Sequence, residues 1–260
     1  MATYNKRGYK APKPVVEEVT PVEQEEIIDD SNSTTAGVFN SLDEGATRTE
    51  EWVARNQKWI YGIVAALALI AIGYVLYEKF VHEPAETEAA NEMYRAELYF
   101  TQAVDATTAP DSLYNLALKG GEGKLGLLGI IENHSGTDAA NLAHYMAGMA
   151  YLNTGKYKEA VTHLEDFKTE DEVLNAMTQG AIGDAFAQLK QNNEALEYYN
   201  KAVSAADNEF TAPRFLFKAG QLALTLNKKE EALKHFKEIK EKYETSAQGA
   251  SIDAYIAMAE

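Results

Sequence analysis

The stretch Ala147–Phe167, AGMAYLNTGKYKEAVTHLEDF, recurs twice further along the chain with different residues in the same pattern. Ile182–Val203 reads IGDAFAQLKQNNEALEYYNKAV, and Ala219–Ile239 reads AGQLALTLNKKEEALKHFKEI. The aligned glycines lie 35 and 37 residues apart, an alanine follows each glycine after 12 residues, and a large apolar residue follows each alanine after four. The aligned residues are Gly148, Gly183 and Gly220, then Ala160, Ala195 and Ala232, then Leu164, Tyr199 and Phe236.

This spacing predicts that each copy is a pair of antiparallel helices. The glycine of the first helix and the alanine of the second let the two helices approach closely. No copy can bury its apolar face alone, so the copies are expected to stack into a right-handed solenoid. Residues 246–260 are expected to form a final solvating helix. The large residues expected to fill the gaps between copies are Tyr151, Leu164, Phe186, Tyr199 and Phe236.

The order of small, aromatic, alanine and aromatic positions at a period near 34 resembles the tetratricopeptide repeat, over about residues 143–245. The resemblance implies an all-α fold in which three repeats follow divergent N-terminal helices at residues 89–142. It also implies a concave, protein-binding face lined by the first helix of each repeat. By position, that face would hold Leu142, Tyr145, Met149, Leu152, Asp184, Gln188, Arg214, Phe217, Gln221 and Leu224. The alternative is that preceding helices, such as one over residues 93–104, cover Tyr145, Met149 and Leu152.

A second stretch, Trp59–Tyr77 (WIYGIVAALALIAIGYVLY), contains no charged residue and no His, Asn or Gln. As a helix it would be roughly 28 Å long, close to the ~30 Å hydrocarbon core of a bilayer. Aromatic residues lie at both ends, as expected at the two membrane interfaces. We therefore predict one transmembrane helix over residues 59–79, with a buried core helix as the alternative. Gly62 and Ala66 form a small-xxx-small pair that would suit packing on another membrane helix.

The segments that precede the span are predicted to face the cytoplasm. Residues 1–41 lack the apolar content to fold and are expected to be a disordered tail, although its Val and Ile pairs would also fit a short linear motif. Residues 42–58 are expected to be a juxtamembrane helix. Basic residues are concentrated before the span, so the positive-inside rule places the repeats in the periplasm, outside the inner membrane. These residues are Lys6, Arg7, Lys10, Lys13, Arg48, Arg55 and Lys58.

Between the span and the repeats, the sequence predicts a hinge at residues 82–88 because of Pro84, then amphipathic helices. The glycine-rich stretch GGEGKLG at residues 120–126 superficially matches a phosphate-binding loop. Its lysine is followed by leucine instead of serine or threonine, and no strand is predicted before it. A turn between two helices is the better interpretation.

The composition argues against several functional classes. The net charge of −16 excludes a broad nucleic-acid-binding face. There is no Cys, no nucleophile turn, and no pair of His residues three or four apart, so we predict no enzyme, metal or cofactor. The triplet Asp111-Ser112-Leu113 resembles the acceptor motif of a bacterial O-glycosylation system, although a helix start explains it equally well.

The order of parts resembles the YfgM-like ancillary subunits of the bacterial Sec translocon. It consists of a charged approach, an Ala/Gly/Ile-rich span, an Ala-rich helix and degenerate repeats. Residues 122–157 are similar in composition to envelope tetratricopeptide proteins of Bacteroidetes. The resemblance implies a role at the translocon exit, with SecYEG, a membrane-anchored peptidyl-prolyl isomerase and unfolded secreted clients as partners. An adaptor for a secretion, cell-division or outer-membrane assembly is the alternative, and a cytoplasmic-facing regulator is a third hypothesis.

Overall fold

The computed structural model describes residues 34–108 and 110–260, with side chains from Thr49 onward. The described part is all-α and contains no strand, which confirms the predicted fold class. The chain forms two units, residues 1–69 and 70–260. Residues 1–33 of the predicted disordered tail lie outside the described residues.

The apolar run lies within helix α1, Thr34–Tyr77. This helix begins earlier than the juxtamembrane helix predicted at residue 42. None of its most apolar 18-residue window is buried by the rest of the described chain, and Trp59 is 77% exposed. A core helix would be covered, so the exposure argues against the buried-helix alternative. The helix is long and apolar enough to cross a membrane.

The hinge predicted at residues 82–88 is wrong. Helix α1 is followed directly by the π-helical turn η2, Glu78–His82, and then by α2, Glu83–Asp105. Pro84 is the second residue of α2 and follows directly on the π-helical turn, so the helical path continues past the proline. Helix α2 therefore runs through the predicted hinge. It buries Ala89, Met93, Ala96 and Ala103.

Helices α3 (Pro110–Lys119) and α4 (Leu127–Asn133) pack with α2 and α5 around one apolar cluster. The glycine-rich stretch between α3 and α4 is a tight turn, as expected. Gly120 has φ +84°, and a Cβ on Gly126 would overlap the backbone at Leu118 and Lys119. Close backbone approach, not phosphate binding, accounts for these glycines.

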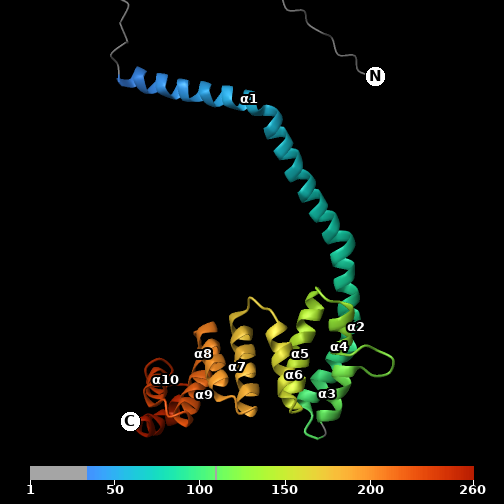
Figure 1. Ribbon diagram of the computed structural model, residues 1–260, viewed down its shortest axis with the longest axis vertical. Coiled ribbons are helices and arrows are strands. Elements are labelled where there is room, and N and C mark those ends of the chain that lie inside the picture. Colours follow the sequence, from blue (N-terminus) through green and yellow to red (C-terminus); the bar gives the residue numbers. More distant parts are fainter. Residues whose placement is uncertain (1–33, 109) are drawn as a thin grey trace, which may run out of the picture. The chain divides into compact units, whose positions relative to one another are not determined.

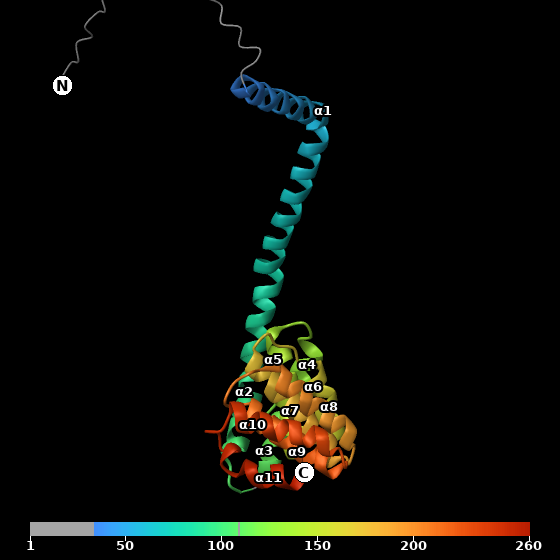
Figure 2. The ribbon, with the colours of Figure 1, turned by 90° about the vertical axis from the view of Figure 1, so that its left-hand side faces the viewer.

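Three helical hairpins follow, and Figure 1 shows them in succession along the unit, while Figure 2 views the same unit from its C-terminal side. A short 3-10 turn and α11 end the chain. The bounds are α5 Asp138–Asn153 with α6 Tyr157–Asp166, α7 Glu172–Gln188 with α8 Asn192–Ala205, α9 Ala212–Thr225 with α10 Lys229–Lys242, then η3 Gly249–Ser251 and α11 Ile252–Ala259. Each hairpin corresponds to one of the aligned sequence copies.

The repeat glycines explain how each hairpin closes. A Cβ on Gly148 would lie 2.5 Å from Cγ of Leu164, and a Cβ on Gly183 would lie 2.7 Å from the Tyr199 ring. Gly220 meets Phe236 in the same way. These large side chains therefore fill a notch inside their own hairpin. The same three residues also lie in clusters with the element that follows, as predicted for the gaps between copies: Leu164 with Ile182, Tyr199 with Phe215, and Phe236 with Ile252.

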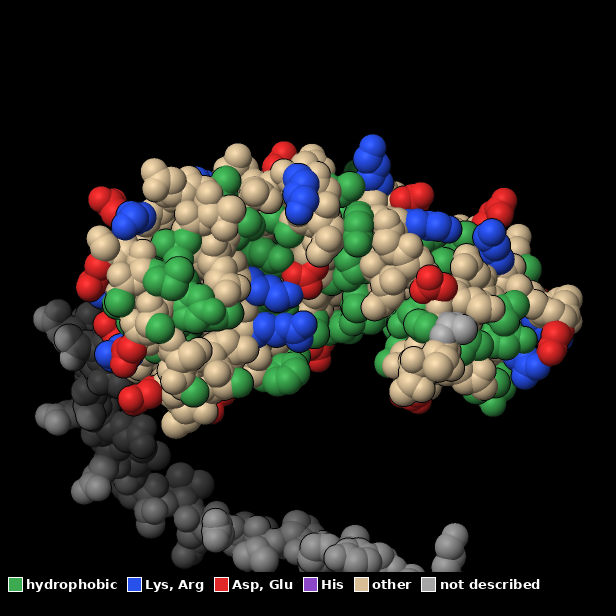
Figure 3. All heavy atoms as spheres, turned by 90° about the horizontal axis from the view of Figure 1, so that it is seen from below, with side chains coloured by type: hydrophobic (Ala, Val, Ile, Leu, Met, Phe, Trp, Pro, Cys, Tyr) green, Lys and Arg blue, Asp and Glu red, His purple; other side chains and the backbone are tan. Residues whose placement is uncertain are grey.

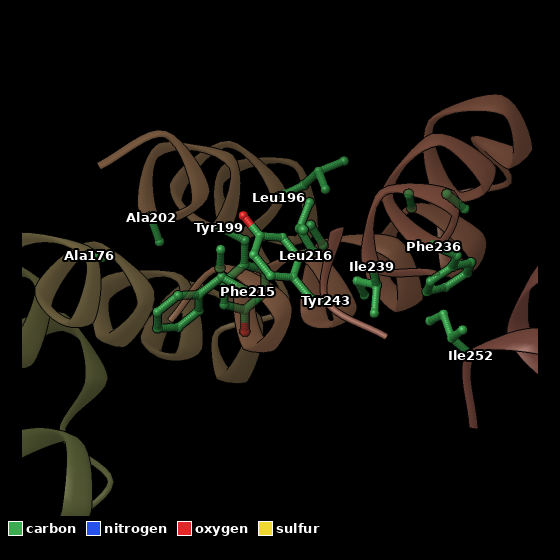
Figure 4. Packing of buried hydrophobic residues seen from close by; sticks show 14 of the residues in the cluster. Ala176, Leu196, Tyr199, Ala202, Phe215, Leu216, Phe236, Ile239, Tyr243 and Ile252 are labelled. Atoms are coloured by element: carbon green, nitrogen blue, oxygen red, sulfur yellow. The ribbon is translucent and has the colours of Figure 1, made fainter. Parts of the chain in front are cut away.

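Contacts between hairpins use a residue that the alignment did not single out. The ring of Phe215 on α9 lies against Gly180 of α7, where any Cβ would overlap it. Figure 4 shows Phe215 and Tyr199 together in the cluster that joins the second and third hairpins. Ile252 of α11 is buried in the same cluster, so the terminal helix closes its end.

Candidate partner-binding surface

The residues predicted to form the concave face all lie on α5, α7 and α9, the first helices of the three hairpins. They differ in how available they are to a partner. Leu142, Gln188 and Gln221 are the most open of the set, whereas most of the others are partly buried. The face is therefore partly committed to contacts within the chain.

On α5, the predicted residues pack mainly toward the second hairpin. Met149 and Leu152 border the cluster formed by α6 and α7. Tyr145 borders this cluster and also the N-terminal cluster that contains Met93, and its ring centre lies 5.1 Å from that of Phe167. Burial raises the pKa of Tyr145. The preceding helices therefore cover Tyr145 in part, whereas Met149 and Leu152 pack toward the second hairpin instead.

Asp184, near the C-terminal end of α7, contacts two neighbouring side chains. The Lys218 Nζ lies 2.5 and 2.7 Å from its two carboxylate oxygens, and the Tyr199 hydroxyl donates a 2.7 Å hydrogen bond to it. Burial and the nearby carboxylate raise the pKa of Tyr199. These contacts join α7, α8 and α9. They also neutralise the one carboxylate in the predicted face.

The contact between Asp184 and Lys218 has an equivalent one repeat later. Gln221 Nε2 lies 3.5 Å from the Tyr255 hydroxyl, again 34 residues apart in sequence. Tyr255 also packs edge-on against Phe217, with ring centres 4.7 Å apart. Helix α11 therefore occupies the place of a fourth first helix. It covers part of the face predicted for the third repeat, including Phe217.

The remaining open surface is mixed in character. On the side of the repeat unit seen in Figure 3, hydrophobic side chains form separate patches with charged side chains between them. Leu142 is 38% exposed, and Arg214 is half-buried with its guanidinium 5.6 Å from the Phe215 ring centre. Such a surface suits a partner that offers both apolar and polar groups.

Sequence reasoning missed several residues at or near this surface. Lys218 lies one repeat further along the chain than Asp184, which it contacts, so only the repeat offset of 34 residues would have indicated it. His144 and His163 are 19 residues apart and meet across the first hairpin. The described residues contain no cluster of three or more potential metal ligands. Ser112 of the acceptor-like triplet is exposed in the first turn of α3.

Comparison with known families agrees with this geometry. The chain matches the tetratricopeptide repeat family over residues 145–210 and 181–247, which together run from within α5 to beyond the end of α10. These hairpins are therefore tetratricopeptide repeats, and the chain carries a helical scaffold of the class that binds other proteins. No characterised protein matches the chain.

Proposed function

We propose that the protein is a single-pass, membrane-anchored scaffold that binds partner proteins through the concave side of its repeats. The observation that carries the proposal is the combination of an uncovered apolar helix with a tetratricopeptide unit in one chain. An 18-residue window with no buried surface would be insoluble in water, and a bilayer removes that cost. The repeats then supply binding at the membrane surface.

The orientation that we propose places the repeats in the periplasm and the N-terminus in the cytoplasm. Basic residues before the span support it, because the positive-inside rule is counted close to the membrane. The absence of Cys from the sequence makes the test direct. Thr3→Cys and Val104→Cys each introduce a single thiol, one on either side of the span. An impermeant maleimide added to spheroplasts should label the Val104→Cys variant alone, and labelling of the Thr3→Cys variant alone would favour the cytoplasmic regulator.

The finer role that we propose is at the exit of the Sec translocon. There the repeats would bind emerging clients beside SecYEG and a membrane-anchored isomerase and pass them to chaperones. The resemblance in the order of parts supports this role. The predicted face supports it too, because it offers both the apolar Leu142 and the cationic Arg214, a mixture that suits varied clients better than one specific ligand. An adaptor for another envelope assembly is the second candidate, supported by the same surface.

The experiment is affinity capture of the full chain from native membranes in mild detergent, with mass spectrometry of the bound proteins. Enrichment of SecYEG and an isomerase is expected. Enrichment of a division or outer-membrane complex without Sec components would instead establish the adaptor.

A double variant in the predicted concave face, compared with a matched control, tests whether partners bind there. Leu142→Gln with Arg214→Gln changes two residues of the open face and leaves the hairpin notches intact. Val104→Gln with Lys237→Gln makes closely similar chemical changes at exposed sites on α2 and α10. The variant in the concave face should lose most of its captured partner proteins, while the control variant should retain them. Equal capture by both would show that partners bind elsewhere.

A further inference from the structure

The first hairpin contains a pair of facing histidines. Nδ1 of His144 on α5 lies 3.3 Å from Nδ1 of His163 on α6, and the ring centres are 5.2 Å apart. A neutral imidazole carries one N–H and one nitrogen that accepts, so when both rings are neutral one can donate to the other across the hairpin. The Tyr151 ring stacks on His163, with centres 5.5 Å apart and planes 22° apart. The pair thus bridges the two helices beside a packed aromatic ring.

The charged groups around the pair are exposed to solvent, which weakens their influence on the two rings. Burial and the neighbouring His144 lower the pKa of His163, and Asp166 opposes them. Asp166 Oδ2 lies 3.8 Å from His144 Nδ1, and its side chain is 60% exposed, so water screens it. The other charged groups near the pair are Asp138, Lys168 and Glu170 around the surface pocket that opens on His144, and Lys156 and Glu159 near Tyr151.

We propose that the His144–His163 pair is an acid-sensitive latch, which holds α5 and α6 together at neutral pH and releases them when both rings are protonated. Protonation of both removes the only acceptor in the shared Nδ1–H···Nδ1 bond. It also leaves two positive charges 3.3 Å apart in a half-buried site. Opening at this point would move α5, which carries Leu142, Tyr145 and Met149. The latch would therefore make the shape of the first repeat depend on the pH of the compartment.

The latch lies beside the contact that closes the first hairpin. His163 directly precedes Leu164, the residue that fills the Gly148 notch. In the second hairpin the equivalent residue is Tyr198, which stacks on Phe186 and donates a hydrogen bond of 2.5 Å to Glu165. Tyr198 carries no charge at acidic pH. The second hairpin thus serves as an internal reference, because the Tyr198 side chain does not titrate between neutral and mildly acidic pH.

Hydrogen–deuterium exchange of the full chain in detergent, followed by mass spectrometry, tests the latch. Rates are corrected for the intrinsic effect of pH and compared at about pH 7.5 and about pH 4.5. The acidic value lies well below the usual histidine range, because a singly protonated pair keeps its N–H···N hydrogen bond and the pKa of His163 is lowered. Peptides from α5 and α6 should lose protection by roughly tenfold or more at the acidic pH, while α7 and α8 change by less than about twofold.

Two variants decide the interpretation. His163→Gln keeps a side chain that can donate to His144 but cannot gain a charge, so it should abolish the acid response. His134→Gln changes a histidine that pairs with Glu92 outside the hairpin and should leave the response intact. His144→Gln replaces His163→Gln if that variant loses helicity at neutral pH. An unchanged wild-type hairpin at acidic pH, or an acid response that persists in the glutamine variant, would overturn the proposal.

Discussion

Replacing Gly183 by alanine tests whether the glycine notches set the hairpin geometry. The new Cβ would lie 2.7 Å from both Cδ1 and Cε1 of Tyr199 and 3.3 Å from the Ala195 carbonyl oxygen. The ring cannot swing aside freely, because Tyr199 is 5% exposed and its hydroxyl is bonded to Asp184. Either the ring or the helix spacing must change.

The magnitude follows from two opposing effects. Overpacking of a core typically costs about 1–3 kcal/mol, while alanine gains roughly 0.5–1 kcal/mol over glycine in a helix. Loss of the hydrogen bond between Tyr199 and Asp184 adds about 1 kcal/mol. The net prediction is a loss of about 2 kcal/mol, equivalent to a decrease in Tm of about 4–8 °C for a unit of this size.

The assay is thermal and denaturant unfolding of the full chain in detergent, followed by circular dichroism. Gly129→Ala is the matched control, because its Cβ would meet only the Leu125 side chain and the change should stay within about 1 kcal/mol. In a Tyr199→Ala background the notch is empty, so Gly183→Ala should stabilise by about 0.5 kcal/mol. A Gly183→Ala protein as stable as wild type, or the same loss in both backgrounds, would refute the notch argument.

Three further changes are predicted to alter stability. Burial lowers the pKa of His235, whose two ring nitrogens have no hydrogen-bond partner. Folding therefore keeps this ring neutral, and the free energy of unfolding should decrease as the pH falls below about 6.5. His235→Leu should raise the free energy of unfolding by about 1 kcal/mol at neutral pH and reduce that decrease, as measured by unfolding curves across pH. Lys218→Met should lower the free energy of unfolding by about 0.5–1 kcal/mol, because it removes a partly exposed partner of Asp184. The difference from wild type should shrink at high salt, and a difference that does not depend on salt would contradict an origin in the ion pair. Tyr243→Phe removes the hydrogen bond to Asp207 and should lower the free energy of unfolding by about 1 kcal/mol in denaturant titrations, with a shift near zero ruling out a stabilising bond.

The sequence determined the repeat fold, because each hairpin carries its own pattern. Gly148, Ala160 and Leu164 recur with fixed spacing, and a fixed spacing on two helices places the same residues at the same contact each time. The apolar run at Trp59–Tyr77 was also visible in the sequence, and it forms a helix long and apolar enough to cross a membrane, because length and composition depend on no other part of the chain. Both features are local, and local patterns can be recognised from one sequence.

The hinge at Pro84 shows where local reasoning failed. Proline removes one backbone hydrogen bond from a helix and often ends it, but α2 follows directly on the π-helical turn Glu78–His82 and the helical path continues past Pro84. The sequence pattern did not indicate that turn.

Only the tertiary structure decided which predicted face residues remain open. In the folded chain Asp184 pairs with Lys218, and Tyr255 packs against Phe217. In each case the partner comes from a helix one repeat further along the chain. The tertiary structure also brought His144 within 3.3 Å of His163, which no helical spacing predicts. The physical reason is that a repeat pattern specifies which residues lie on each helix face. The pairing of one face with the next depends on how the hairpins stack, and stacking involves contacts that are distant in sequence.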